Sequence, residues 1–91
     1  HNNKSGEQGS LDVEGVFIAV GIVPDTAICT DLVELDEKGY VIADETCVTS
    51  ESGIFAAGDI RKKPMRQIIT AVADGANAVH SVQEYLNAQK I

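Results

Sequence analysis

The chain has 91 residues, 44% of them hydrophobic and 23% charged, which is the composition of one small folded domain rather than of a disordered segment. Its 14 acidic and 7 basic residues give a formal net charge of −7, which disfavours nucleic acid and anionic membranes as partners. No apolar run is long enough to cross a bilayer and no signal-peptide pattern is present, so we expect a cytoplasmic protein that does not bind the membrane.

The first ten residues are polar, and residues 2–6 are typical of a turn. A turn this early implies a partner strand upstream that the 91 residues do not contain, and the first residue is not methionine. We therefore expect the C-terminal part of a longer protein, although His1 is equally compatible with a residue added for expression.

The next stretches predict strands and turns. The near-continuous apolar run Leu11–Val20 predicts a strand buried on both faces. The breaker Gly21–Thr26 contains a proline and leads into a short helical turn at Ala27–Leu32. The segment Leu35–Val48 predicts a short strand pair around the turn Asp36–Gly39.

A second apolar segment, Ile54–Ala57, predicts a short buried strand that stops at Gly58-Asp59. A loop with the only basic cluster of the chain follows, and then a helical pattern runs from Arg66 to Leu86. Apolar residues recur there at three- and four-residue steps and form one stripe, made of Ile68, Ile69, Val72, Ala76, Val79, Val82 and Leu86. Small residues cover another part of this helix, and Gly75 within it predicts the close approach of a neighbouring element.

The order strand, Gly-Asp, loop, helix makes Gly58 and Asp59 a candidate ligand site. In open α/β sheets, ligands lie at the carboxyl ends of strands and face helix N-termini. Glycine lets the backbone approach a ligand closely, and the Asp59 carboxylate suits the hydroxyls of a ribose or ribityl chain. A plain turn is an equally good interpretation on pattern alone.

The remaining reactive side chains favour structural roles. Cys29 and Cys47 are separated by 17 residues, which is neither a C-x-x-C redox pair nor metal-ligand spacing, so we expect small buried thiols. His80 is expected on the helix surface, because no acidic or nucleophilic partner for catalysis is recognisable. We expect no catalytic residue and no metal ligand in the chain.

Two motifs carry a resemblance to a known family. The segment G-I-F-A-A-G-D at residues 53–59, followed by R-Q-I-I-T-A at residues 66–71, resembles the last flavin-binding segment of bacterial low-molecular-weight thioredoxin reductases. The upstream G-V-F-I-A-V-G-I-V-P-D-T at residues 15–26 is similar to the strand by which that family returns to its flavin domain. The resemblance covers essentially the whole chain.

The resemblance implies an α/β fold, namely the C-terminal portion of a Rossmann-like FAD-binding domain with a few short strands and one long C-terminal helix. Residues 1–14 would be the end of the NADPH-domain hairpin, and residues 15–91 the C-terminal half of the FAD-binding domain. The parent protein would use FAD and NADPH to reduce thioredoxin, and it would be a homodimer.

The same resemblance implies that five residues bind FAD: Gly58, Asp59, Arg66, Gln67 and Ile68. Asp59 would accept a hydrogen bond from a ribityl hydroxyl. The backbone N–H groups of Gln67 and Ile68 would face the pyrimidine edge of the flavin, where the helix N-terminus carries partial positive charge. Arg66 would add a formal charge, with a solvated residue of the first helical turn as the alternative.

The sequence leaves other functions open. It contains no G-x-G-x-x-G and no C-x-x-C, so we do not expect the 91 residues alone to turn over substrate. Related flavoproteins remain alternatives, above all the flavoprotein subunit of alkyl hydroperoxide reductase; a thioredoxin-reductase-like ferredoxin reductase matches the helix start less well. A small non-enzymatic α/β interaction domain is the alternative from another class.

Overall fold

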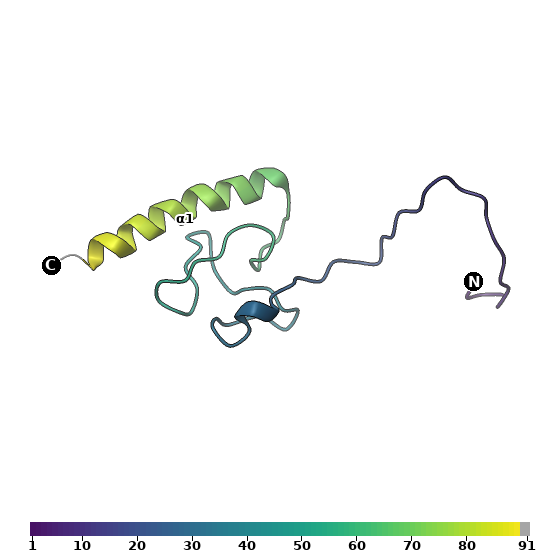
Figure 1. Ribbon diagram of the computed structural model, residues 1–91, viewed down its shortest axis with the longest axis horizontal. Helices are drawn as coiled ribbons and strands as arrows, with labels where there is room; N and C mark the ends of the chain where they lie inside the picture. Colours follow the sequence, from purple (N-terminus) through teal and green to yellow (C-terminus); the bar gives the residue numbers. More distant parts are fainter. Residues whose placement is uncertain (90–91) are drawn as a thin grey trace.

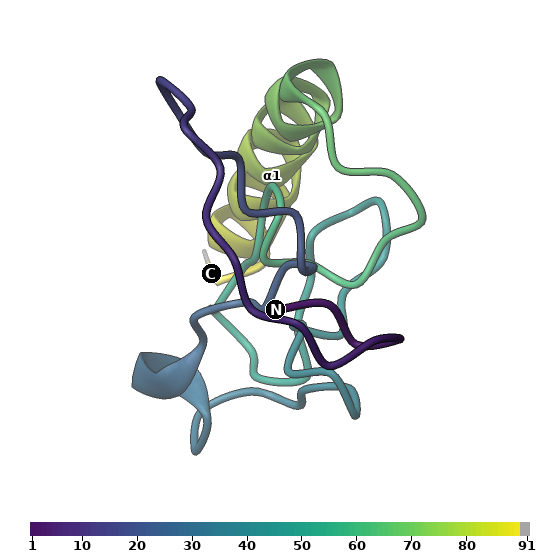
Figure 2. The same ribbon diagram turned by 90° about the vertical axis from the view of Figure 1, so that its right-hand side faces the viewer.

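The computed structural model describes residues 1–89 and contains two helices, η1 and α1 (Figure 1). The 3-10 helix η1 spans Ala27–Cys29, and the α-helix α1 spans Ile68–Ala88. They lie on opposite sides of a body of loops, and the N-terminal segment runs away from that body, which gives the chain overall extents of 70 × 27 × 20 Å (Figures 1 and 2). Within the described residues, no helix is both long and apolar enough to span a membrane.

The long helix forms as predicted, with its start two residues later. Gln67 is the N-cap, with an extended backbone (φ −137°, ψ 164°), and its N–H donates to Thr70 Oγ1 at 2.9 Å. Gln67 and Thr70 form a capping box, in which the side chain of each residue contacts the backbone N–H of the other. A capping box satisfies donors that an α-helix leaves without intrahelical partners. Arg66 stays outside α1 because its side chain binds the loop that precedes it.

The predicted strands are reduced to isolated bridges in the described residues. Leu35 pairs with Val41 and Val48 with Phe55 in antiparallel bridges, and Val41 pairs with Arg61 in a parallel bridge. The prediction of a strand over Leu11–Val20 is wrong for this structure, because no described segment lies beside it to accept its backbone hydrogen bonds. Its apolar side chains are accordingly exposed, Phe17 completely.

The loops enclose a small hydrophobic core. Its buried members are Val33, Val41, Ala43 and Ala56, with Cys29, Leu35, Ile54 and Ile60 packed against them. Two backbone hydrogen bonds join Val41 to the loop after residue 58. The Val41 N–H donates to Ile60 O at 2.9 Å, and the Val41 carbonyl accepts from the Lys62 N–H at 2.8 Å. These two bonds fix the basic loop to the core and so position everything that follows Gly58.

The helix α1 turns a polar face toward the body and its apolar stripe away from it. Asp74 and Ser81 are buried at 2% and 8% exposure, and Tyr85 meets Phe55 edge to face at 6.1 Å between ring centroids. The stripe residues Ile68, Ile69, Val72, Val79 and Leu86 are 55–87% exposed. The close approach predicted at Gly75 is also absent, since nothing within the described chain comes within 4 Å of the position of a Cβ there.

The exposed stripe leads to a prediction about the isolated chain. We expect the 91 residues on their own to self-associate or to unfold at a low temperature, because apolar patches of this kind drive association. Sedimentation velocity at several concentrations, together with thermal unfolding, measures both effects. A concentration-independent monomer that unfolds cooperatively at a high temperature would contradict this expectation.

Candidate functional site

Four of the five predicted site residues line one open pocket at the N-terminus of α1. The pocket has a volume of about 540 Å³ and is lined by Asp59, Arg66, Gln67, Ile68, Ala71 and Val72. The lining thus combines polar residues, Asp59, Arg66 and Gln67, with aliphatic residues of the first helical turns. Gly58, the fifth predicted residue, is buried next to it, and a Cβ at this position would lie 3.8 Å from Ala71 Cβ.

Asp59 lines the pocket with an exposed side chain. Its backbone carbonyl is used inside the chain, where it accepts a hydrogen bond from Arg66 Nε at 3.0 Å. The side chain is exposed, and no group within residues 1–89 donates a hydrogen bond to the carboxylate. An exposed carboxylate with free lone pairs is able to accept hydrogen bonds from the hydroxyls of a ligand.

Arg66 is held by three contacts, so the interpretation as a merely solvated residue does not apply. Its Nε donates to Asp59 O, its Nη2 donates to Arg61 O at 3.2 Å, and its guanidinium lies 3.7 Å from the centre of the Tyr40 ring. Stacking of a guanidinium on an aromatic face combines packing with cation–π attraction. Arg66 therefore fixes the 59–61 turn and places a positive charge at the edge of the pocket.

The helix N-terminus offers fewer free donors than predicted. The Gln67 N–H, expected to face a ligand, is paired with Thr70 Oγ1 in the capping box. The Ile68 N–H belongs to the first turn of α1, which has no carbonyl partners within the helix. The dipole of a 21-residue helix still favours negative charge at this end of the pocket.

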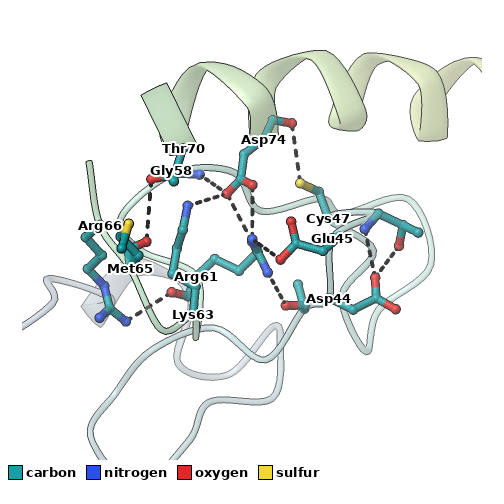
Figure 3. Close-up of polar contacts among 12 residues, drawn as sticks. Asp44, Glu45, Cys47, Gly58, Arg61, Lys63, Met65, Arg66, Thr70 and Asp74 are labelled. Carbon is teal, nitrogen blue, oxygen red and sulfur yellow. Dashed lines mark hydrogen bonds and ion pairs between the residues drawn. The ribbon is translucent and has the colours of Figure 1, made fainter. Parts of the chain in front are cut away.

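A buried ion cluster centres on Asp74, in the second turn of α1 (Figure 3). The Asp74 carboxylate accepts four hydrogen bonds: from Gly58 N–H at 2.8 Å, from Arg61 Nε and Nη2 at 3.0 Å each, and from Lys63 Nζ at 2.9 Å. The side chains of Asp74, Arg61 and Lys63 are each 2–3% exposed. Arg61 also donates to Ala43 O and to the exposed carboxylate of Glu45, both at 3.0 Å.

The electrostatics of the cluster favour full ionisation. The guanidinium of Arg61 holds the pKa of the Asp74 carboxyl far below its ordinary value, with Lys63 and the Gly58 N–H acting in the same direction against burial. In return, the hydrogen bond with Asp74 raises the pKa of Arg61. Charge-assisted, bidentate contacts of this kind are stronger and more directional than neutral hydrogen bonds.

Comparison with known proteins assigns the family. The sequence model of the family described as "Pyridine nucleotide-disulphide oxidoreductase" matches residues 1–75. The chain belongs to this family.

Among curated relatives of this oxidoreductase chain, the thioredoxin reductase of Listeria innocua is 46% identical over 85 residues, which cover 93% of the chain and 27% of the relative. The thioredoxin reductase of Treponema pallidum is 45% identical over 92% of the chain and 27% of its own length. The chain thus spans about a quarter of the length of the curated relatives that it matches. The resemblance to thioredoxin reductases is confirmed.

Solved structures agree with this assignment. The thioredoxin reductase of Streptococcus pyogenes matches with a TM-score of 0.77 and 46% identity, covering 93% of the chain and 28% of the structure. That of Lactococcus lactis matches with a TM-score of 0.75 and 43% identity over 81% of the chain and 24% of the structure. The predicted likeness to a thioredoxin reductase fold and the long helix are confirmed; the short strands are seen here only as bridges.

The remaining reactive side chains have structural surroundings. Cys47 is completely buried and Cys29 partly so, and both are free thiols. Burial raises the pKa of the Cys47 thiol, which keeps it protonated and unreactive. His80 lies on the surface of α1, as predicted, but it does have an acidic neighbour, because its Nε2 is 3.1 Å from Glu84 Oε1.

Sequence reasoning missed Asp74 and its partners in this family member. The signal that points to Asp74 is a single acidic residue in the otherwise small or apolar run 71–76 of the helix. Ser81, one heptad later, falls on the same face and donates to Thr46 O at 2.7 Å. These polar positions, rather than the apolar stripe, mark the face by which α1 contacts the body.

Proposed function

We propose that the chain is the C-terminal part of an NADPH-dependent thioredoxin-disulfide reductase and forms one wall of its FAD site. The observation that carries the proposal is the pocket at the N-terminus of α1, where Asp59, Arg66, Gln67 and Ile68 come together. Its support from outside the chain is the similarity to thioredoxin reductases of known structure.

The pocket fits FAD on chemical grounds. Its lining includes the aliphatic residues Ile68, Ala71 and Val72, which suit the face of an isoalloxazine ring, and Asp59, whose carboxylate suits a ribityl hydroxyl. When bound, FAD would supply the chemistry that passes reducing equivalents from NADPH to a disulfide.

The residues of this chain would bind the cofactor and shape its electrostatic surroundings. Asp59 would accept a hydrogen bond from a cofactor hydroxyl, and the Ile68 N–H would be available to donate one to the ligand. Arg66 and the α1 N-terminus together favour negative charge at this edge. Gln67 contributes its backbone N–H only if the bond to Thr70 Oγ1 opens.

The finer organisation follows from the same proposal. Residues 1–14 would end the hairpin of the NADPH domain, and residues 15–91 would be the C-terminal half of the FAD domain. The exposed stripe of α1 would be covered in the complete homodimeric enzyme, thioredoxin would be the substrate partner, and the enzyme would be cytoplasmic.

One observation favours a second candidate function. The exposed apolar stripe of α1 also suits a non-enzymatic interaction domain that binds a partner protein. The flavoprotein subunit of alkyl hydroperoxide reductase stays an alternative within the flavoprotein class. A thioredoxin reductase and this subunit are distinguished by the electron acceptor that they reduce. Bound flavin distinguishes both of them from an interaction domain.

The test uses the full-length protein that carries this chain. We expect it to be purified yellow, or to become yellow on addition of FAD, and to oxidise NADPH only when thioredoxin disulfide is present. Absorbance spectra and NADPH consumption measure both properties. A colourless protein that does not take up FAD would contradict the flavoprotein assignment, and a flavoprotein indifferent to thioredoxin would contradict the substrate.

A further inference from the structure

The buried ion cluster contacts the candidate FAD site at two points: the Asp74 carboxylate accepts the Gly58 N–H, and the Arg61 carbonyl accepts a hydrogen bond from Arg66 Nη2. Of the four donors around the Asp74 carboxylate, three belong to cationic side chains and one is the backbone N–H of Gly58. Gly58 immediately precedes Asp59, which lines the pocket. The Gly58 N–H is therefore the covalently shortest connection between the cluster and the Asp59 carboxylate.

The backbone around Gly58 depends on that connection. Gly58 has a φ of +89°, a left-handed conformation that only glycine adopts without strain. Its carbonyl accepts the Arg61 N–H at 3.1 Å, which closes a turn over residues 58–61. Asp74 holds the beginning of this turn and Arg66 holds its Asp59 and Arg61 carbonyls, so the turn is fixed at both ends.

The cations explain why Asp74 serves as a rigid anchor. Arg61 engages both carboxylate oxygens and Lys63 binds the oxygen that also accepts the Gly58 N–H, so the carboxylate has no freedom to rotate (Figure 3). Arg61 is in turn fixed by Ala43 O and by the bridge of Val41 to the same loop. The orientation of the Gly58 peptide is thus set by residues that never reach the pocket.

We propose that Asp74 is a positioning residue for FAD binding, which acts through the Gly58 N–H to hold Asp59 in place for the cofactor. The inference rests on the proposed FAD site. Asp74 does not line the pocket. The proposal nevertheless predicts that a substitution at Asp74 weakens FAD binding, whereas a substitution that only destabilises the fold does not.

The experiment uses Asp74→Glu in the full-length protein, with Ser81→Ala as the matched control. Glutamate keeps the negative charge for Arg61 and Lys63, but its extra methylene displaces the carboxylate from the Gly58 N–H. Ser81 lies on the same buried face of α1, and its loss removes one hydrogen bond from helix to body without touching Gly58. FAD affinity is measured by flavin fluorescence, and melting is recorded with and without FAD.

We expect Asp74→Glu to raise the FAD dissociation constant about tenfold and to reduce the rise in melting temperature that FAD confers. Ser81→Ala should lower melting of the apo-protein but leave the dissociation constant unchanged. Equal effects of both variants on FAD affinity, or none from Asp74→Glu, would overturn the inference. A wild-type protein that binds no FAD would instead overturn the proposed function.

A second variant covers the case in which Asp74→Glu does not fold. Gly58→Ala strains the left-handed turn and leaves the ion cluster intact, since the added Cβ meets only Ala71 at an ordinary contact distance of 3.8 Å. The proposal requires this variant also to bind FAD about tenfold more weakly. An unchanged FAD dissociation constant in Gly58→Ala would overturn the inference on its own.

Discussion

Asp74→Ala is expected to lower the free energy of unfolding by about 3–5 kcal/mol, because it leaves buried cations without a counter-charge. Arg61 and Lys63 would lose their counter-charge at about 3% side-chain exposure, and the Gly58 N–H would lose its acceptor. Such a loss is a large fraction of the stability of an ordinary domain. Urea unfolding of the full-length protein without FAD measures it.

The control for this variant is a double variant that also removes the positive charge of Arg61. Asp74→Ala combined with Arg61→Leu should be less unstable than Asp74→Ala alone, because replacing both members of a buried pair avoids an unpaired charge. A loss below about 1 kcal/mol in Asp74→Ala, as at an exposed ion pair, would contradict the buried cluster.

The same variant has a defined pH dependence. The pKa of Asp74 is lowered in the folded protein, so its ionisation stabilises the fold above the ordinary aspartate pKa of about 3.8, and that stabilisation is lost as the pH falls below it. The difference in stability between wild type and Asp74→Ala should therefore be constant near neutral pH and shrink on acidification below about pH 4. A difference that is independent of pH down to acid unfolding would contradict ionic stabilisation.

Local pattern predicted the long helix, and the resemblance to thioredoxin reductases predicted the residues that line the pocket; both depend on residues that are close in sequence. The three- and four-residue spacing of apolar side chains between 66 and 86 specifies a helix whatever surrounds it. Asp59 and Arg66 are seven residues apart, and the resemblance to thioredoxin reductases placed them at one ligand. Their convergence on one pocket followed without knowledge of the rest of the fold.

Contacts between residues far apart in the sequence were not predicted. The contact between Asp74 and Arg61 spans 13 residues, and Arg61 appeared in the sequence only as one member of a basic loop cluster. Nothing in the local spacing shows that this cation turns inward rather than toward solvent. The strand predicted over Leu11–Val20 failed for the related reason that a strand requires a partner, and its sequence does not say where that partner lies.

The orientation of α1 shows the limit of hydrophobic periodicity. The rule that a helix buries its apolar stripe does not describe the contact of α1 with the body, because the contacts of Asp74, Ser81 and Tyr85 determine the docking. A stripe of five large side chains left at more than half exposure is typical of a surface that associates with another one.

Asp59→Ala is expected to raise the FAD dissociation constant of the full-length protein about ten- to hundredfold. The variant removes a charged acceptor from a cofactor hydroxyl, which typically costs about 1.5–3 kcal/mol of binding free energy. Asp59→Asn keeps an acceptor oxygen without the charge and should fall between wild type and Asp59→Ala. Fluorescence titration of the apo-protein with FAD gives all three constants.

Melting of the apo-protein decides between a ligand-binding residue and a turn residue. Within residues 1–89 the Asp59 carboxylate accepts no hydrogen bond and is exposed, so neither variant should change apo-protein melting appreciably. Asp44→Ala is the matched control, because the exposed Asp44 carboxylate accepts the Thr46 N–H at 2.9 Å within a turn away from the pocket. It should lower melting slightly and equally with and without FAD. If Asp59→Ala behaved like Asp44→Ala and left FAD affinity unchanged, Asp59 would be a turn residue and the FAD site would lose its principal polar contact.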